Sequence, residues 1–390
     1  MSPTPRHPWL ILGVVLFGSV AAVIAQFAAP PLMPLLMEAF GIDLAQASTL
    51  MSVFSVTGLV LALPAGVILG RFGPVVTGVV ALGSVVAGSA MGAVAPDYTI
   101  LLFSRLVQGV GMGLIGVTAP AIVAATFAPE RRGTPMGIWA TWVPLGGLIM
   151  YNVAPVLAAT GGWQAAWWFA GAVALVAGVL WVVVLAAWLP PRPAPGAGPG
   201  PIPLRTALAG RDIWLLAAAF GMFAVAMGGF NTFLPTFLAS EGGYELAAAS
   251  RTSSVVLLGS LLGSLGSGLL SDRIGSRRRV YTGAALVLAV LWVLPYIVDP
   301  AFVPVLLLAI GLGSGALPAA IFASAPEAMR DRRAAGAGMA ALMVGQNGGM
   351  VVGPVMFGAL VTATTWSTAG LVLGVVSVAG AVVGWRARIR

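Results

Sequence analysis

The sequence predicts an all-α integral membrane protein with twelve transmembrane helices in two pseudo-symmetric six-helix bundles. Three observations support this fold class. The chain is 59% hydrophobic and 8% charged, with a mean hydropathy of +1.02. Its arginines gather in short polar gaps between long apolar stretches, and its two halves repeat the same features in the same order. Because a bilayer core of about 30 Å requires about 20 apolar residues per helix, 390 residues leave room for twelve crossings.

Arginine marks the polar gaps. The 19 basic residues are all arginine, and all but Arg105 and Arg251 lie in seven gaps, which hold Arg6; Arg71; Arg131 and Arg132; Arg192, Arg205 and Arg211; Arg273, Arg277, Arg278 and Arg279; Arg330, Arg332 and Arg333; Arg386, Arg388 and Arg390. The gaps between them hold Glu38, Asp43, Asp97, Glu241, Glu245 and Asp299. Cytoplasmic loops are enriched in basic residues, so this alternation predicts a multi-pass protein of the cell (inner) membrane with both termini in the cytoplasm.

The apolar stretches give the predicted helices in order. In the first half they are 9–36, 46–69, 74–95, 99–127, 134–158 and 164–189. In the second half they are 213–239, 246–271, 280–298, 302–325, 334–361 and 367–386. Most end beside an arginine, an acid or a turn that contains glycine or proline. The first stretch resembles a cleaved signal peptide, but a second copy of the same helix begins at 213, which favours a retained helix.

One long break divides the chain. Between Pro190 and Pro203 there are seven prolines and three glycines, a composition that cannot hold a helix and is typical of a solvated linker. We therefore expect an N-terminal six-helix bundle at 1–189, a cytoplasmic linker at 190–212 and a C-terminal bundle at 213–390.

The two halves repeat at an offset near 200. Phe17-Gly18 matches Phe220-Gly221, Gly66-x3-Gly70-Arg71-Phe72-Gly73 matches Gly268-x3-Asp272-Arg273-Ile274-Gly275, Gly111-x-Gly113 matches Gly311-x-Gly313, and Pro129-Glu130 matches Pro326-Glu327. Four pairs in one order indicate internal duplication. Repeats of this kind place a substrate path between the halves near the bilayer midplane.

Two motifs resemble those of the major facilitator superfamily. Gly268-Leu-Leu-Ser-Asp272-Arg273-Ile-Gly275-Ser-Arg277-Arg278 is similar to the loop signature of that superfamily, and Arg105-Leu-Val-Gln108-Gly109-Val-Gly111 is similar to its fourth-helix motif. With the six-plus-six topology, the resemblance covers essentially the whole chain. Tract 133–144 resembles the cyanate and nitroimidazole permease-like branch and its nitrate permease-like neighbours.

The resemblance implies a gating role for the loop residues Asp272, Arg273 and Gly275, and for Arg71 and Gly73 in the first half. The first-half loop departs from the signature, because Gly70 stands where an Asp is expected and Pro74-Val75 where basic residues are expected. A charged latch is therefore expected in the second half.

Arg105 is the one charge inside a predicted helix core, followed one turn later by Gln108 on the same face. A charge in a membrane usually faces a cavity or a partner, and a guanidinium can bind a planar anion through two hydrogen bonds. Arg105 and Gln108 are therefore candidates for substrate recognition. The alternative is that Arg105 donates to backbone carbonyls and holds helix 4 to its neighbours.

All 11 acidic residues map to loops or helix ends, with Glu38 nearest to the membrane interior. This distribution disfavours a buried proton carrier of the kind that drug–proton exporters use. The chain has no cysteine and one histidine, His7, so we expect no metal and no cofactor. Gly111-Met-Gly113-Leu-Ile-Gly116 fits a dinucleotide-binding pattern but no strand precedes it, so helix packing explains it better.

Polar and aromatic side chains in the helices complete the candidate site. Gln26 and Asn231 occupy nearly matching positions in the two repeats, and Asn231 follows Phe230; a second such pair sets Tyr151 and Asn152 against Gln346 and Asn347. Trp139 and Trp142 lie three residues apart and could stack on a flat substrate. Packing between helices is the alternative for each of these side chains.

These observations predict a secondary active or facilitative transporter, and not an enzyme, that moves a small inorganic or organic anion by alternating access. The alternative is an antiporter that exports hydrophobic drugs, which the aromatic and methionine content of the helices favours. The expected partners are a small-molecule substrate and the lipid bilayer. We expect a monomer that binds no nucleic acid, because the net charge of +8 resides in loop arginines.

Overall fold

The computed structural model describes residues 7–128, 131–188, 206, 208–329 and 335–389. Within these ranges the regular structure is helical throughout, and twelve segments are long and apolar enough to cross a membrane. The predicted all-α fold with twelve crossings is therefore confirmed. Most of the predicted linker lies outside the described residues, and α10 begins at Arg211, inside the range assigned to that linker.

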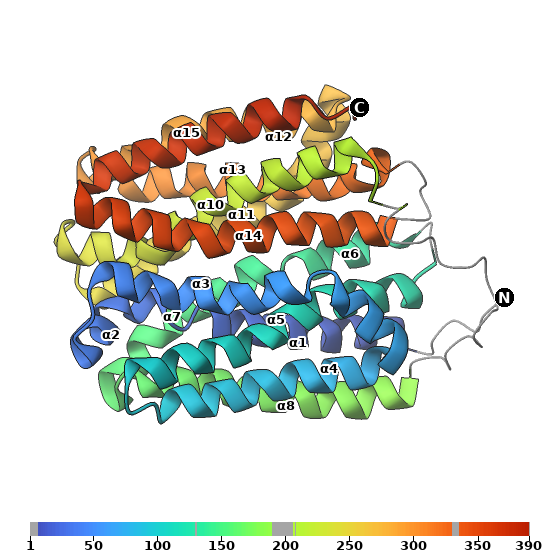
Figure 1. The fold of residues 1–390 in the computed structure, drawn as a ribbon, viewed down its shortest axis with the longest axis horizontal. Coiled ribbons are helices and arrows are strands. Elements are labelled where there is room, and N and C mark those ends of the chain that lie inside the picture. The colour runs from blue at the N-terminus through green and yellow to red at the C-terminus, as the bar shows by residue number, and fades with distance from the viewer. Residues whose placement is uncertain (1–6, 129–130, 189–205, 207, 330–334, 390) are drawn as a thin grey trace.

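The N-terminal half supplies the first six crossings, coloured blue to green in Figure 1. Their elements are α1 (Pro8–Gln26), η1 (Pro30–Leu32), α2 (Met33–Phe40), α3 (Leu44–Leu61), α4 (Pro64–Ala93), α5 (Tyr98–Thr126), α6 (Gly133–Ala140), α7 (Trp142–Gly161) and α8 (Gln164–Trp188). Asp43 and Gln46 form a capping box at the start of α3, and the Asp97 carboxylate accepts from the Ile100 amide at the start of α5. These acids therefore fix where two helices begin.

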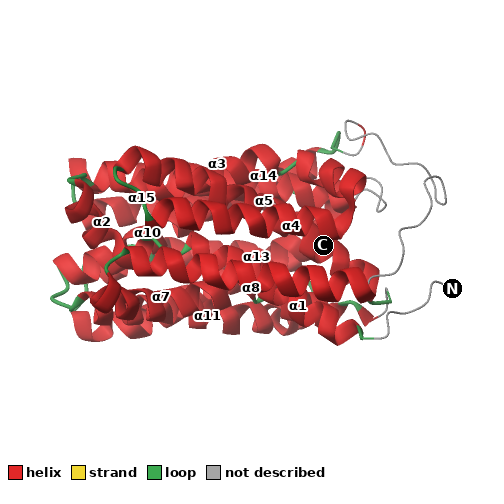
Figure 2. Ribbon diagram, turned by 90° about the horizontal axis from the view of Figure 1, so that it is seen from below, coloured by secondary structure: helices red, strands yellow, loops and turns green. Residues whose placement is uncertain are grey.

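The C-terminal half supplies the other six crossings and lies beside the first half in Figure 1, coloured yellow-green to red. Its elements are α10 (Arg211–Ser240), α11 (Leu246–Ile274), α12 (Arg277–Leu291), η3 (Leu294–Tyr296), η4 (Pro300–Phe302), α13 (Val303–Ala328), α14 (Ala335–Ala363) and α15 (Trp366–Trp385). Figure 2 shows that the helices of both halves run along the same long axis.

Four of the predicted helices are interrupted in the structure. The stretch 46–69 is divided between α3 and α4 ahead of Pro64, and the stretch 280–298 is divided between α12 and η3 ahead of Pro295. The stretch predicted as one helix over 9–36 is α1, a turn, η1 and α2, because Pro30 and Pro31 lack the amide hydrogen that would continue the ladder. The fifth crossing breaks at Thr141, between α6 and α7, where Pro144 cannot donate to the carbonyl of Ala140. Composition and hydropathy detect the crossings but average over such breaks.

A further break falls where the sequence predicts a turn. Inside α4 the backbone of Gly73 is not helical, with φ 81° and ψ 168°, and Pro74 follows it. A positive φ favours glycine over any residue with a Cβ. The break separates the second crossing from the third, next to Arg71, as the arginine pattern predicts.

Helices within each half approach closely through glycine. A Cβ on Gly345 of α14 would lie 2.0 Å from the carbonyl oxygen of Ala217 in α10, and one on Gly263 of α11 would lie 2.0 Å from that of Leu312 in α13. Such distances leave no room for a methyl group, so these backbones pack directly against each other. Small residues at helix contacts are typical of membrane bundles.

The two halves contact each other through a limited set of elements. The closest pairs are α3 with α14 and α7 with α11, joined by contacts of η1 and α2 with α10. Within the described part of the chain, α6 is not among the elements that pack closely against the C-terminal half. The contact between the halves therefore runs along α3, from Ser48 to Gly58, and along α7, and does not include α6 at the start of the fifth crossing.

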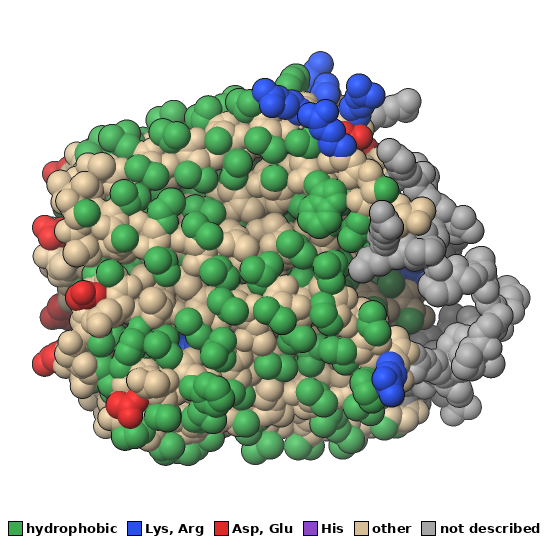
Figure 3. Space-filling view, viewed as in Figure 1, with side chains coloured by type: hydrophobic (Ala, Val, Ile, Leu, Met, Phe, Trp, Pro, Cys, Tyr) green, Lys and Arg blue, Asp and Glu red, His purple; other side chains and the backbone are tan. Residues whose placement is uncertain are grey.

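Charged side chains gather at the two ends of the molecule. In Figure 3 most acidic side chains lie at the left end and most arginines at the right, where an acidic side chain also lies among them. We call the first the acidic end, defined by Glu38, Asp43, Asp97, Glu241, Glu245 and Asp299, and the second the arginine end, defined by Arg71, Arg131, Arg132, Arg273, Arg277, Arg278, Arg279, Arg386 and Arg388. The apolar belt between them matches a protein that spans a bilayer.

Candidate functional site

Arg105 is fully buried in α5, and every N–H group of its guanidinium has an acceptor. Nε donates to the carbonyl of Leu50 (3.1 Å), Nη1 to the carbonyl of Ala25 (2.7 Å) and Nη2 to the carbonyl of Gln26 (2.8 Å). The two remaining N–H groups reach Gln108 Oε1 (2.7 Å) and Met51 Sδ (3.6 Å). In this conformation Arg105 therefore has no donor left for a substrate.

The break in the first crossing frees one of the carbonyls that Arg105 engages, that of Gln26, because Pro30 has no amide hydrogen to donate to it. Ala25 and Gln26 are the last residues of α1, and the Ala25 carbonyl also accepts from the Ala28 amide (3.4 Å). A cation at the C-terminal end of a helix is also favoured by the helix dipole. Arg105 thus satisfies the broken end of α1 and ties it to α3 and α5.

Neighbouring side chains hold the guanidinium in place. The Phe54 ring lies 4.7 Å below its central carbon, a cation–π contact. Gln108 accepts from Arg105 and donates through Nε2 to Ser89 Oγ (3.0 Å) in α4. The predicted pair of Arg105 and Gln108 therefore exists, as part of a buried network that links the first four crossings.

Tyr151 joins the two halves of the molecule. Its hydroxyl donates to the carbonyl of Asn231 in α10 (2.6 Å), and its own carbonyl accepts from Ser250 Oγ in α11 (2.5 Å). Its ring also lies against Phe27, at the break after α1, with centroids 5.8 Å apart. We call these contacts the Tyr151 lock, because they connect α7 to two helices of the other half.

Gln26 and Asn231 carry carboxamides without a hydrogen-bond partner among the described residues. Both residues are nearly buried, with 5% and 8% of their surfaces exposed, yet their polar atoms remain within reach of water. Asn231 lies at the Tyr151 lock, where the halves meet. Of this repeat-related pair, the structure therefore places Asn231 at the interface and Gln26 at the broken end of α1.

The second repeat-related pair separates in space. Asn152 donates to the carbonyl of Leu148 (2.8 Å) and Asn347 to that of Met343 (2.9 Å), each within its own helix. Asn347 faces the other half, because a Cβ on Gly58 would lie 2.6 Å from its Oδ1. Asn152 lies one turn from Val156, which is 65% exposed, so it shares the lipid-facing side of α7.

Gln346 precedes Asn347 and lies on a different face of α14. It is partly exposed, and its carboxamide has no partner among the described residues. Gly345 and Gly349 pack against α10, and Asn347 faces Gly58 of α3, which fixes the orientation of α14. Gln346 is thus directed between the halves.

The predicted aromatic residues pack inside the bundles. Trp139 and Trp142 stack with centroids 5.4 Å apart across the break between α6 and α7, and the Trp139 indole donates to Ser19 Oγ (3.1 Å). Both are nearly buried, at 8% exposure. Phe230 is fully buried against Trp292, inside the C-terminal bundle. The structure therefore does not bring Phe230 to the interface between the halves.

The loop residues lie at the arginine end. Gly275 ends α11 with φ +67°, the left-handed conformation that glycine favours, and Arg273 is exposed in the last turn of α11. Arg71 stands over the Phe72 ring at 5.5 Å. The side chain of Asp272 lies outside the described residues, as do Arg332 and Arg333.

An ion pair in the second loop was not predicted. Arg277 Nη1 donates to Glu327 Oε1 (2.7 Å) and to the carbonyl of Ala323 (2.6 Å), which ties the start of α12 to the end of α13. The repeated Pro-Glu pair was the available signal. Val75 occupies the position of Arg277 in the first half, so the first loop cannot form the same pair.

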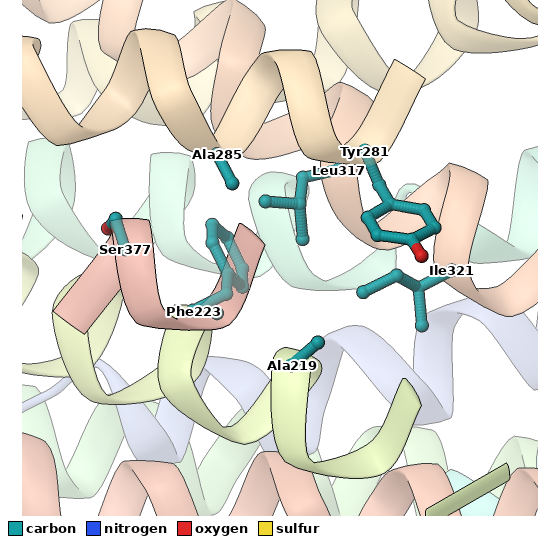
Figure 4. Close-up of a pocket in the computed structure, with 8 residues that line it drawn as sticks. Ala219, Phe223, Tyr281, Ala285, Leu317, Ile321 and Ser377 are labelled. Carbon is teal, nitrogen blue, oxygen red and sulfur yellow. The ribbon is translucent and has the colours of Figure 1, made fainter. Parts of the chain in front are cut away.

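The cavity drawn in Figure 4 lies inside the C-terminal bundle. Figure 4 shows Ala219, Phe223, Tyr281, Ala285, Leu317, Ile321 and Ser377 around it. Its volume of about 10 Å³ is at the limit for one water molecule. Another hollow, of about 320 Å³, opens at the acidic end between Phe237, Tyr296 and Trp366. Neither is lined by the residues that join the two halves.

Comparison with known proteins identifies a family match across the chain. The model of the Major Facilitator Superfamily matches residues 15–335 and 247–390. A probable sulfoacetate transporter of Cupriavidus necator is 25% identical over 395 residues, which cover 92% of this chain and 88% of the relative. An MFS-type efflux pump of Mycolicibacterium smegmatis is 28% identical over 340 residues, which cover 80% of this chain and 74% of the relative.

A hexuronate transporter of Bacillus subtilis is 24% identical over 275 residues; the match covers 67% of this chain and 64% of the transporter, slightly less than two thirds of its length. None of these three relatives is a cyanate or nitrate permease, so the resemblance of tract 133–144 to that branch gains no support from them.

A solved structure shares the fold. A bacterial homolog of the human lysosomal transporter Spinster, in an inward-facing and unoccupied conformation, superposes with a TM-score of 0.74. The match covers 97% of this chain and 95% of that one at 17% identity. At that identity the likeness supports the fold alone.

Proposed function

We propose, from the premise that this chain belongs to the major facilitator superfamily, that it moves a small anion across the membrane by alternating access. Family and relatives identify a transporter of small solutes that is not an enzyme. The anionic nature of the substrate is the proposal.

The charge balance of the membrane interior carries this proposal. Among the described residues, Arg105 is the one charged side chain that is buried, and the described acids lie at helix ends or in links. An anion between the halves is therefore not repelled by any carboxylate among the described residues. A cation at the same place has no carboxylate among the described residues to neutralise its charge. Arg105 adds positive potential from behind the carbonyls that it engages.

The relatives also support an anionic substrate. Sulfoacetate and hexuronates, named in two of them, are organic anions at neutral pH. We propose that Asn231, Gln346 and Asn347 contact the substrate, and that Gln26, Tyr151, Trp139 and Trp142 shape the site around it. Arg105 and Gln108 set its electrostatics, and a direct contact of Arg105 with substrate requires that α1 or α3 move. We assign gating to Asp272, Arg273, Gly275, Arg71 and Gly73.

Ligand-induced thermal stabilisation of the purified protein tests the proposal. A ligand at 100 times its dissociation constant adds about 2.7 kcal/mol to the free energy of unfolding. We expect anions to raise the melting temperature and matched neutral amides to have less effect. Stabilisation by lipophilic cations alone would contradict the proposal.

The alternative function is export of hydrophobic drugs. The relative from Mycolicibacterium smegmatis is named as an efflux pump, and methionine and tryptophan are frequent in this chain, at 15 and 12 residues. Methionine-rich surfaces adapt to varied apolar ligands. Cationic dyes in the same thermal assay separate this alternative from anion transport.

A further inference from the structure

Glycine contacts on two sides fix the orientation of α14. Gly345 and Gly349 face α10, where a Cβ would lie 2.0 Å and 2.1 Å from the carbonyl oxygens of Ala217 and Gly221. On the other side Gly358 faces α3, where a Cβ would lie 3.1 Å from Ser48 Cβ. Val352 and Val355, at 51% and 40% exposure, point toward lipid.

The remaining face of α14 looks into the space between the halves. At about 100° per residue, this face carries Met339, Met343, Gln346 and Met350, between the α10 side and the α3 side and opposite the lipid side. All four side chains are partly exposed. Met350 Sδ reaches α10, lying 3.0 Å from where a Cβ on Gly228 would stand. We call these four residues the methionine face.

The methionine face is apolar and carries one polar group. The Gln346 carboxamide is partly exposed and has no partner among the described residues, so it is free to bond a ligand. Thioether side chains are flexible and polarisable and pack well against apolar or aromatic surface. They cannot replace the hydrogen bonds that water makes to a small inorganic ion, and removing water from such an ion without replacing those bonds is costly in free energy.

We infer that the substrate is an organic acid with an apolar body, which packs on the methionine face while Gln346 bonds its polar group. The inference rests on the proposed anion transport and narrows it, because it disfavours inorganic anions such as nitrate or sulfate. Ligand sites are typically apolar with a few placed polar groups, and this face has that composition.

A series of acids tests the inference on the full-length purified protein. Thermal stabilisation gives apparent affinities for acetate, butyrate, hexanoate and 3-phenylpropionate, with nitrate, sulfate and the matched primary amides as comparisons. Burial of one methylene group contributes about 0.8 kcal/mol, so we expect affinity to rise roughly fourfold for each methylene that contacts the face.

Two variants assign the effect to this face. Met343→Thr is expected to flatten the dependence on chain length. Its control is Met222→Thr, because Met222 is also partly exposed but packs against Gly380 of α15, away from α14. Gln346→Leu is expected to weaken every acid by roughly three- to tenfold, the effect of one hydrogen bond, and to keep the dependence on chain length.

The outcomes distinguish the inference about the apolar body of the substrate from the proposed anion transport. If nitrate or acetate binds as tightly as 3-phenylpropionate, the inference is wrong and anion transport stands. If the amides or lipophilic cations stabilise the protein and the acids do not, anion transport itself is wrong. If Met222→Thr flattens the series as much as Met343→Thr, or if Gln346→Leu leaves all affinities unchanged, the methionine face is not the site.

Discussion

Arg105 illustrates how a buried charge can be stabilised without a counter-ion. Its five N–H groups meet three backbone carbonyls, the Gln108 carboxamide and the Met51 thioether. Three of these acceptors belong to α1 and α3 backbones, so the side chain holds two helix segments as well as its own. A change at Arg105 should therefore alter stability before it alters recognition.

We expect Arg105→Gln to lower the free energy of unfolding by about 1 to 3 kcal/mol, the usual cost of leaving a buried acceptor without its donor. The shorter carboxamide cannot reach all three carbonyls, so the Gln26 carbonyl, which has no helical donor because of Pro30, then lies buried without a partner. Arg105→Lys should be intermediate, because an ammonium has three donors and no planar fork. Thermal unfolding in detergent measures both variants.

The matched control for Arg105 is Arg251→Gln, since Arg251 is exposed at the acidic end. It should change the melting temperature little. Equal stability of Arg105→Gln and the native protein would mean that the carbonyl network does not hold the broken first crossing.

Tyr151 gives a second prediction at this scale. Tyr151→Phe removes the bond to the Asn231 carbonyl, worth about 1 kcal/mol, and should shift the population about fivefold toward states in which the halves separate at the acidic end. Because the chain has no cysteine, a single Ala28→Cys reports this opening through its rate of thiol labelling. Ala28 is fully buried next to Phe27 in the present conformation.

Tyr281→Phe is the control for the Tyr151 lock. Tyr281 is as buried as Tyr151 and donates to the carbonyl of Gly384, but both belong to the C-terminal bundle. It should leave labelling of Ala28→Cys unchanged. The same increase from both substitutions would show that the label reports loosened packing and not separation of the halves.

The sequence identified these residues better than it identified their partners. Arg105 stood out because a charge in an apolar stretch is rare, and Gln108 followed from helical spacing. The acceptors could not be predicted, because the Gln26 carbonyl is available only through the break at Pro30, and those of Ala25 and Leu50 depend on how α1 and α3 pack against α5. Ser250 and the methionine face depend on helix rotation, which a pattern of apolar residues in a membrane does not specify.

At the scale of elements, backbone contact between helices explains the glycine content of the second half. α14 meets α10 through Gly345, Gly349 and Gly353, with carbonyl oxygens of α10 filling the space where Cβ atoms would be. The same helix leaves the methionine face open to the other half. α14 therefore combines a tight contact with α10 inside its bundle and an adaptable methionine face toward the space between the halves.

We expect Gly345→Ala to lower the free energy of unfolding by about 2 kcal/mol or more, because the new methyl group would overlap the Ala217 carbonyl. Gly348→Ala is the control, since nothing lies within 4 Å of its Cβ position. That change should be neutral or slightly stabilising through helix propensity. If both variants unfold at the same temperature, the close approach of α10 and α14 is not essential.

The helix boundaries were predicted well where the length of an apolar stretch sets them, and less well where a proline interrupts the helix. The crossings at 99–127 and 367–386 agree with α5 and α15 to within about two residues. The first crossing was wrong as a single helix, although Pro30 and Pro31 marked the break. In soluble helices such a pair ends the helix, but in a membrane a neighbouring side chain can satisfy the freed groups, as Arg105 does.

For the whole molecule, the distribution of contacts describes one state of a two-state cycle. The halves meet through α2, α3, α7 and η1 but not through α6 at the start of the fifth crossing, and the Tyr151 lock lies within that contact. A transporter in this state would release or accept substrate from the arginine end. Whether this state is open to the inside or the outside of the cell then depends on which end of the molecule faces the cytoplasm.

We predict that the arginine end is cytoplasmic. Basic residues in short loops are retained on the cytoplasmic side, and the described arginines other than Arg105 and Arg251 lie at this end, visible at the right of Figure 3. Reporter fusions after Gly200 and after Arg390 should both give cytoplasmic signals. A fusion after Gly243, in the link between α10 and α11 at the acidic end, should give an external signal. An external signal from the fusion after Gly200 would contradict this prediction. It would mean that the molecule has the opposite orientation in the membrane, because the twelve crossings are confirmed. The Tyr151 lock would then close the cytoplasmic side, and the present state would be outward-open.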